Sequence, residues 1–259
     1  MRQNTHIHNS FWVFGAVRAP HFLFSLFFSS IMPFSKKLVA IKKACKITDT
    51  IFSSLARNIG SFGTERDIAR FIKKEIRSRG LRPAFEPIVG SGPGGAEPHH
   101  KPQNVPLVAG FCVIDLGVRV NGYCSDMTRT VFFGKPSKKH REIYALVLSS
   151  QKNGVKLLKD GVFAEPIWRV SYKSLGAHRN RFIHGLGHGL GKHIHLRPFL
   201  KKKSKDVLKA GDIVTVEPGV YFKTRFGIRI EDDFLVTKNG FVRLSKTTNK
   251  LLCFPVPAK

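Results

Sequence analysis

Apolar residues follow helical spacing near the start of the chain. They recur every three or four positions from Ile41 to Ile59, and Gly60 ends the pattern. Thr64 and Asp67 have the spacing of a capping box, which marks the start of a second helix. A third, long helix is expected after Pro136-Ser137. We therefore predict three helices, over about residues 36–59, 65–79 and 137–160.

Shorter apolar runs predict the strands, at about residues 85–89, 111–120, 123–133, 213–222 and 227–237. Helices alternate with hairpins rather than with single strands. We therefore expect an α+β fold with a mainly antiparallel sheet. The end of the chain, from Cys253, is expected to be frayed.

The hairpin over 111–133 places two acids near each other. Asn121-Gly122 is a strong signal for a two-residue type I′ turn, which pairs Val120 with Tyr123. In that register Asp115 lies opposite Thr128, and Asp126 shares the face of Thr128. The two acids are then diagonal neighbours, roughly 7–8 Å apart at the backbone.

Two carboxylates on one face repel each other, so one must keep its proton unless a cation lies between them. The alternative is a solvated face on which the acids pair with Arg119 or Arg129. The hairpin alone leaves both interpretations open.

A second pair of acids lies in the later strands. Glu217 follows an apolar strand, and Pro218-Gly219 interrupts the ladder so that the carboxylate can turn inward. In the next strand Arg229 and Glu231 alternate with isoleucines. Taken alone, this alternation favours a solvent-facing stripe of Arg and Glu.

The segment HGLGHGLG, residues 184–191, changes that balance. Glycine at every second position disfavours a helix and suits an extended segment that another backbone can approach closely. His184 and His188 share one face, and His195 follows. Three histidines together with four acids at strand positions predict a metal site with oxygen and nitrogen ligands.

Acidic residues are scarce in this chain, so several of them at apolar strand positions call for an explanation. The 259 residues include 44 Lys and Arg but only 17 Asp and Glu, a formal net charge of +27. Such a surface attracts polyanions without specificity. The four cysteines form no CxxC pair, which suits a reducing compartment, and we expect the protein in the cytosol. No apolar run approaches the roughly 20 residues needed to span a bilayer.

Residues 1–35 differ from the rest. They contain seven of the 22 phenylalanines and no acid, and the run from His21 to Phe28 resembles the apolar part of a signal peptide. Alternatively, Met32 is the true start. We treat residues 1–35 as an extension and 36–259 as the domain that carries the candidate metal site.

Five segments, in this order, resemble the pita-bread metallopeptidases, which include methionine aminopeptidases, Xaa-Pro aminopeptidases, prolidases and creatinase. They are SGPGGAEPHH, VIDLGVRVNGYCSDMTRTVFFG, FIHGLGHGLG, TVEPGVYF and GIRIEDDFLVT. GYCSDMTRT, EPGVY and RIEDD resemble the Xaa-Pro branch most. The resemblance implies the pita-bread fold, a curved and mainly antiparallel sheet flanked by helices, over about residues 36–252.

Carried over by position, the resemblance implies a dinuclear metal site. Asp115 would hold one ion, and His188 and Glu217 the other. Asp126 and Glu231 would bridge both. Carboxylates with a single imidazole favour Mn²⁺, with Fe²⁺, Co²⁺ or Zn²⁺ as alternatives.

The same resemblance implies the residues that act on the substrate. His99, His184 and His195 would contact the scissile carbonyl and the leaving group and move protons. Glu217 would relay a proton, Arg229 would buttress the site, and Thr128 would support the bridging carboxylate.

The chain departs from the family in three ways. It contains no match to the N-terminal domain of the long Xaa-Pro aminopeptidases, and its residues 1–35 match nothing in the family. It also reads Lys192-His193-Ile194-His195-Leu196 where relatives often carry acids, which affects the substrate rim rather than the ligands.

The expected activity is hydrolysis of the N-terminal bond of short peptides by a dinuclear metalloenzyme, before proline. Activity of the methionine aminopeptidase type is the alternative, and a creatinase-like amidase ranks lower because all five ligands are present. A non-catalytic protein that binds the ribosome or nucleic acid would suit the +27 charge and Lys201-Lys202-Lys203, but not the complete ligand set.

Overall fold

The computed structural model describes the backbone of Met1 and residues 22–257, and the side chains of Met1 and residues 36–257. Most of the Phe-rich extension over residues 1–35 therefore lies outside the described residues. Among the residues described, no helix is long and apolar enough to cross a membrane.

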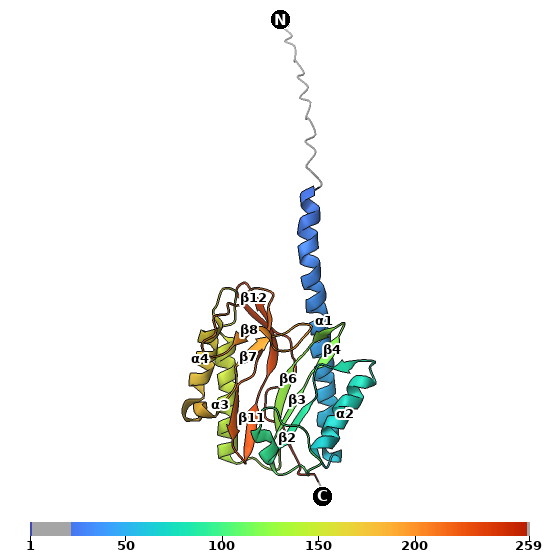
Figure 1. Ribbon diagram of the computed structural model, residues 1–259, viewed down its shortest axis with the longest axis vertical. Coiled ribbons are helices and arrows are strands. Elements are labelled where there is room, and N and C mark those ends of the chain that lie inside the picture. The colour runs from blue at the N-terminus through green and yellow to red at the C-terminus, as the bar shows by residue number, and fades with distance from the viewer. Residues whose placement is uncertain (2–21, 258–259) are drawn as a thin grey trace.

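The described helices flank a central group of strands. They are α1 (Phe22–Asn58), α2 (Glu65–Arg77), α3 (Lys138–Val155) and α4 (Ala164–Ser174), with 3₁₀ turns η1 (Ile59–Ser61), η2 (Gly92–Ala96) and η3 (Gly176–Arg181). Figure 1 shows α1 and α2 on one flank of the strands and α3 and α4 on the other.

The predicted helices are present, but their bounds differ. The first begins at Phe22, well before the expected start after Ser35. The capping box of α2 is confirmed: the Thr64 hydroxyl accepts from the Asp67 N–H at 3.2 Å, and Asp67 Oδ2 accepts from the Thr64 N–H at 3.0 Å. The third ends at Val155, not near residue 160.

Helix α4 was not predicted. Pro166 stands in its first turn, which a helix tolerates but which makes the sequence look like a loop. Tertiary packing stabilises the helix: Ser171 hydrogen-bonds Ser150 of α3 at 2.7 Å, and Gly154 of α3 allows close approach.

The strands form four sheets. They are β1 (Arg82–Pro83), β2 (Ile88–Ser91), β3 (Gly110–Leu116), β4 (Val118–Val120), β5 (Tyr123–Cys124), β6 (Met127–Phe133), β7 (Gly187–Gly189), β8 (Leu196–Leu200), β9 (Ile213–Val216), β10 (Gly219–Phe222), β11 (Phe226–Arg229), β12 (Asp232–Thr237), β13 (Gly240–Arg243) and β14 (Cys253–Phe254). Their orders are β14-β6-β3-β2, β13-β12-β9-β7-β8, β1-β4-β5 and β10-β11. Every described strand pairing is antiparallel except that of β14 with β6, as expected for an α+β fold.

Three expectations about strands were wrong. The chain from Cys253 is not frayed, because β14 pairs in parallel with β6, where Cys253 lies opposite Phe132. The strand expected over 227–237 divides in two, with a break at Ile230-Glu231, and the strand expected at 85–89 is displaced to Ile88–Ser91. The strand expected over 213–222 breaks at Glu217-Pro218, which is the interruption that Pro218-Gly219 predicts.

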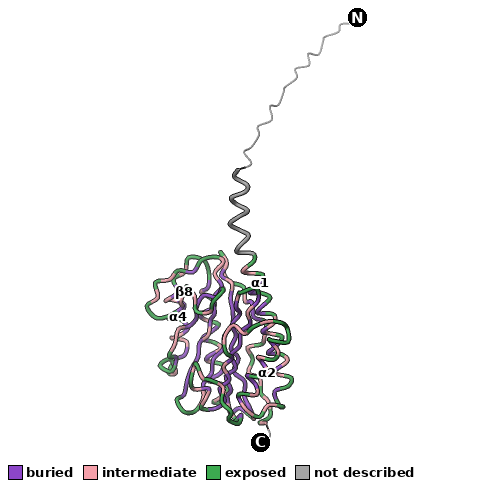
Figure 2. The backbone as a smooth tube through the Cα atoms, turned by 45° about the vertical axis from the view of Figure 1, so that its right-hand side comes forward, coloured by how far each residue is buried: buried purple, intermediate pink, exposed green. Residues whose placement is uncertain are grey.

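Two main apolar clusters hold these layers together. One joins α1 and α2 to the sheet of β3 and β6 around Ile72 and Ile114; the other joins α3 and α4 to β9 and β12 around Val147 and Val216. Buried residues concentrate in the strands at the centre (Figure 2). The strands that carry the acids are therefore anchored on both flanks.

Candidate metal centre

The first hairpin has the expected register. Asn121 and Gly122 have φ of 49° and 81°, as a type I′ turn requires, and Asp115 pairs with Thr128. The ladder opens between β5 and β6, so Asp126 lies outside both strands. Its N–H donates to Asp233 Oδ2 at 3.0 Å, which fixes the backbone there.

Neither arginine proposed in the alternative interpretation neutralises these acids. Arg119 donates to the backbone carbonyls of Gly122 and Lys192, and Arg129 pairs with Asp232 at 2.6 Å. The expected partner was wrong because Arg129 lies opposite Ile114, on the other face of the hairpin. Arg229 makes the contact instead, with Nη2 2.7 Å from Asp115 Oδ2.

The second pair does not face the solvent: Glu231 is buried and Glu217 is half-buried. Glu217 stands in the break between β9 and β10, and Glu231 in the break between β11 and β12. Only 2% of Glu231 and 3% of Arg229 is exposed, so the interpretation as a polar surface stripe was wrong.

The glycines around His188 allow close packing of three strands. A Cβ on Gly187 would lie 2.0 Å from the Thr215 carbonyl oxygen, and one on Gly189 would lie 2.2 Å from that of Arg197. His188 is thus held on extended backbone between β9 and β8, with its side chain buried. This is the close approach that the alternating glycines predict.

All the predicted site residues line one cavity of about 500 Å³: His99, Asp115, Asp126, His184, His188, His195, Glu217, Arg229 and Glu231. They come from both hairpins, from the His/Gly segment and from the loop before β3. The structure therefore brings together residues that lie up to 132 positions apart, from His99 to Glu231.

The potential ligand atoms are close together. One atom each from Asp126, His188 and Glu231 lies within 4.8 Å of the others. Glu217 adjoins them, with Oε1 3.5 Å from His188 Nε2. Asp115 Oδ1 points to no hydrogen-bond partner although it is buried. An unpaired carboxylate oxygen beside three other carboxylates fits a cation.

Electrostatics leads to the same assignment. Burial raises the pKa of Asp115, raises that of Glu217 to about 8, and raises those of Asp126 and Glu231 well above the usual range. Repulsion among these carboxylates adds to the effect. Divalent cations would remove both penalties, so the residues present fit a dinuclear site.

The imidazole of His188 is oriented to act as a ligand. Nδ1 lies 3.1 Å from the Gly189 carbonyl oxygen and 3.2 Å from the N–H of His195. In the tautomer in which Nδ1 carries the proton, Nε2 presents its lone pair toward Glu217 and Asp126, at 3.5 and 3.8 Å. Burial lowers the pKa of His188 to about 4, so it is neutral at pH 7.

A hydrogen-bonded chain orients the neighbours of the carboxylates. Arg229 donates to Asp115, to the Thr128 hydroxyl at 3.0 Å and to the Tyr221 hydroxyl at 3.1 Å. The Thr128 hydroxyl in turn donates to Glu231 Oε2 at 2.7 Å. The predicted supporting positions of Arg229 and Thr128 agree with these contacts.

The three pocket histidines differ in their surroundings. His184 Nε2 lies 2.8 Å from the Tyr221 hydroxyl, and burial lowers the pKa of His184 to about 3. His99 and His195 are exposed at the cavity. His195 has φ of 58°, and its ring stands 4.4 Å from that of His188.

Sequence reasoning missed two residues that support the site. Tyr221 connects Arg229 to His184, and Asp233 holds the backbone at Asp126. Both lie in segments that carry the resemblance, EPGVY and RIEDD, and that is the only signal that could have drawn attention to them.

The chain is similar to known metallopeptidases. Residues 39–238 match metallopeptidase family M24. The chain is 39% identical to the Xaa-Pro dipeptidase of Pyrococcus furiosus over 227 residues, which are 86% of this chain and 65% of that protein.

Solved structures of related peptidases share the fold of this chain. The prolidase of Thermococcus sibiricus superimposes with a TM-score of 0.82 at 35% identity, over 85% of this chain and 61% of that one. The X-Pro aminopeptidase of Thermotoga maritima also gives 0.82, at 31% identity, over 85% and 64%. The chain thus spans less than two thirds of these relatives' length. Its fold is the pita-bread fold of these enzymes, and the chain belongs to metallopeptidase family M24.

Proposed function

We propose that this chain is a metal-dependent exopeptidase that hydrolyses the N-terminal bond of short peptides in which proline is the second residue. The observation that carries the proposal is the convergence of three buried carboxylates, half-buried Glu217 and His188 on one cavity. The proposal is also supported by the Xaa-Pro dipeptidase and X-Pro aminopeptidase among the relatives.

We assign Asp115, Asp126, His188, Glu217 and Glu231 as the metal ligands. When bound, two divalent cations supply a nucleophilic water at neutral pH and polarise the peptide carbonyl. Oxygen-rich ligation with one imidazole suits Mn²⁺ best.

The protein's own groups would position the substrate and move the protons. Glu217 is placed to accept a proton and pass it to the leaving nitrogen. His99 and His195, exposed at the cavity, would contact the scissile carbonyl and the leaving group. His184, whose ring nitrogens lie within hydrogen-bonding distance of the Gly185 carbonyl and the Tyr221 hydroxyl, would line the substrate pocket beside them. Arg229 would orient Asp115 and favour its ionised form, against the effect of burial, which raises the pKa of Asp115.

Purified protein should be assayed with Mn²⁺, Fe²⁺, Co²⁺ and Zn²⁺ against Ala-Pro, Ala-Pro-Ala and Met-Ala-Ser. Release of the first residue from the proline peptides, lost in Asp126→Asn, is the expected result. Cleavage of Met-Ala-Ser alone would favour a methionine aminopeptidase. Absence of bound metal and of all cleavage would favour a binding protein, which the net charge of +27 suits.

The free thiols bear on location. All four cysteines are unpaired, and Cys253 is exposed. Exposed free thiols persist in reducing compartments. We therefore propose a cytosolic location.

A further inference from the structure

Glu231 lies outside the regular strands, so the hydrogen bonds of a sheet ladder do not fix its backbone. It falls in the gap between β11, which ends at Arg229, and β12, which begins at Asp232. Its N–H donates to the Thr128 carbonyl at 3.1 Å rather than to a partner strand of its own sheet. The position of this carboxylate therefore depends on contacts outside the regular ladder.

Arg129 supplies one of those contacts, from the face of β6 that points away from the cavity. Its Nη1 donates to the carbonyl oxygen of Glu231 at 2.6 Å and to that of Thr128 at 2.8 Å. The guanidinium thus joins β6 to the Glu231 backbone. The two residues do not touch through their side chains.

The remaining donors of Arg129 are also occupied. Nη2 donates to Asp232 Oδ1 at 2.6 Å and to the Thr247 carbonyl at 3.0 Å, and Nε donates to the Thr248 carbonyl at 3.0 Å. A guanidinium has five N–H groups, and all five are used. Only 2% of Arg129 is exposed, so no water can replace a lost contact without rearrangement.

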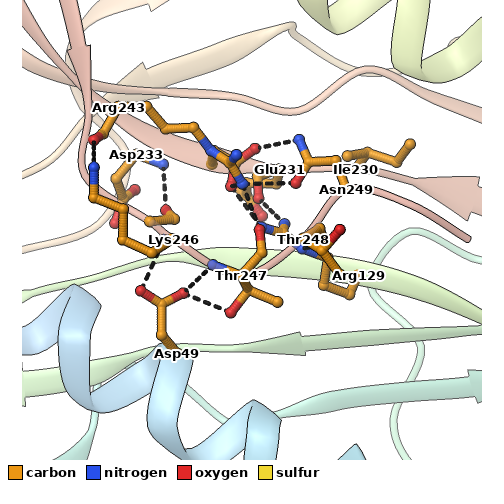
Figure 3. Close-up of polar contacts among 12 residues, drawn as sticks. Asp49, Arg129, Ile230, Glu231, Asp233, Arg243, Lys246, Thr247, Thr248 and Asn249 are labelled. Carbon is orange, nitrogen blue, oxygen red and sulfur yellow. Dashed lines mark hydrogen bonds and ion pairs between the residues drawn. The ribbon is translucent and has the colours of Figure 1, made fainter. Parts of the chain in front are cut away.

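The loop over residues 245–249 that receives two of these bonds is itself fixed to α1. Asp49 accepts from the N–H groups of Lys246 and Thr247, both at 2.8 Å, and from the Thr247 hydroxyl at 2.6 Å. Figure 3 shows Asp49 below this loop and Arg129 beside Glu231. A continuous set of hydrogen bonds therefore runs from α1 to the backbone of Glu231.

We propose that Arg129 is a positioning residue for the metal centre. It holds the Glu231 backbone so that the carboxylate faces Asp126 and His188. The inference rests on the proposed function, in which Glu231 is a metal ligand. Groups that orient ligands from outside the ligand set typically change metal affinity by about 10–100-fold when they are replaced.

Arg243 provides a matched control. It also pairs with Asp232 Oδ1, at 2.7 Å, and also donates to the Thr247 carbonyl, at 2.6 Å. No contact with the Glu231 backbone accompanies these bonds among the described residues. A role limited to the stability of the loop and of Asp232 would make the two arginines equivalent.

The experiment compares Arg129→Lys with Arg243→Lys, which both keep the charge beside buried Asp232. Mn²⁺ affinity is measured by equilibrium dialysis, and the geometry of the bound ions by electron paramagnetic resonance. We expect Arg129→Lys to bind Mn²⁺ about 10-fold more weakly with an altered spectrum, because one ammonium cannot reach all five acceptors. Arg243→Lys should resemble the wild type in both measurements.

Equal affinities in all three proteins, or equal losses in both variants, would overturn the inference. Failure of the proposed function looks different, because the wild type would then bind no metal or cleave no peptide. If Arg129→Lys does not fold, Asp49→Asn, at the accessible end of the same set of bonds, is measured instead. A Mn²⁺ affinity within error of the wild type in Asp49→Asn would likewise contradict the inference.

Discussion

Glu217 and Glu231 occupy opposite positions of one interrupted antiparallel ladder. Val216 pairs with Asp232 on one side of the break, and Gly219 pairs with Arg229 on the other. The register is the same on both sides, so the two glutamates face each other where neither belongs to a strand. Pro218 prevents the ladder from closing between them. The fold thus brings buried Glu231 and half-buried Glu217 together, and a cation can offset the repulsion between their carboxylates.

This relationship predicts that Glu231→Gln stabilises the metal-free protein but weakens both the stabilisation by Mn²⁺ and the activity. The amide keeps the size of the side chain and removes a buried charge near Glu217, so the metal-free variant should melt several degrees above metal-free wild type at about pH 8. The stabilisation by Mn²⁺ should largely disappear, and kcat/KM should fall by about 10³-fold or more. Melting curves with and without Mn²⁺ measure both effects. A lower melting temperature for the metal-free variant would contradict the prediction.

The same carboxylates make the effect of metal depend on pH. Burial raises the pKa of Glu217 from 4.5 to about 8, so its contribution to stability in the metal-free protein is present below pH 4.5 and lost as pH rises toward 8. Half-buried His184 and buried His188 have pKa values lowered to about 3 and 4, so their contribution to stability is present above pH 6.5 and is lost as pH falls toward these values.

Metal requires the ionised carboxylates and the neutral imidazole, which are both favoured as pH rises. The increase in melting temperature on adding Mn²⁺ should therefore be about twofold larger or more near pH 8 than near pH 5.5. Differential scanning fluorimetry across this range measures it. An increase that does not change with pH would show that the site carboxylates do not bind the ion.

The His/Gly segment offers a matched pair of substitutions. Gly187→Ala places a Cβ 2.0 Å from the backbone oxygen of Thr215, whereas Gly185→Ala meets nothing closer than 3.5 Å. We expect Gly187→Ala to lower the free energy of unfolding by about 2 kcal/mol or more and to displace His188. Gly185→Ala should stay near wild type. Urea unfolding of both proteins distinguishes this outcome from a general intolerance of the segment.

The exposed His195 allows substrate contact to be separated from metal binding. His195→Ala removes a side chain that lines the cavity and that we assign to the substrate. We expect kcat/KM on Xaa-Pro peptides to fall by about 10²-fold with Mn²⁺ content unchanged. Steady-state kinetics and metal analysis of the same preparation test this. A parallel loss of metal would place His195 among the ligands instead.

The sequence supported good predictions where local chemistry decides the outcome. Asn121-Gly122 determines the turn, and the turn determines that Asp115 lies opposite Thr128. Pro218-Gly219 predicts a break beside Glu217. Neighbouring residues impose each of these features, so they can be predicted without knowing the rest of the fold.

Predictions failed where distant segments compete for the same group. Arg129 could be named as a candidate partner of the first acids, but its true partners are Asp232 and the loop over 245–249. Helix α4 and strand β14 were missed for the same reason. Each is a short segment with a weak pattern that packing or pairing against a distant element stabilises.

The sequence by itself therefore determined which side chains can serve a metal centre and how each is presented along its own strand. Only the tertiary structure decided that these side chains meet and that Arg229, rather than Arg119 or Arg129, pairs with Asp115. It also decided that Arg129 donates a hydrogen bond to the backbone carbonyl of Glu231. The physical reason is that turns and strand faces depend on neighbouring residues. A buried charge, by contrast, is stabilised by whichever donors the completed core brings within hydrogen-bonding distance.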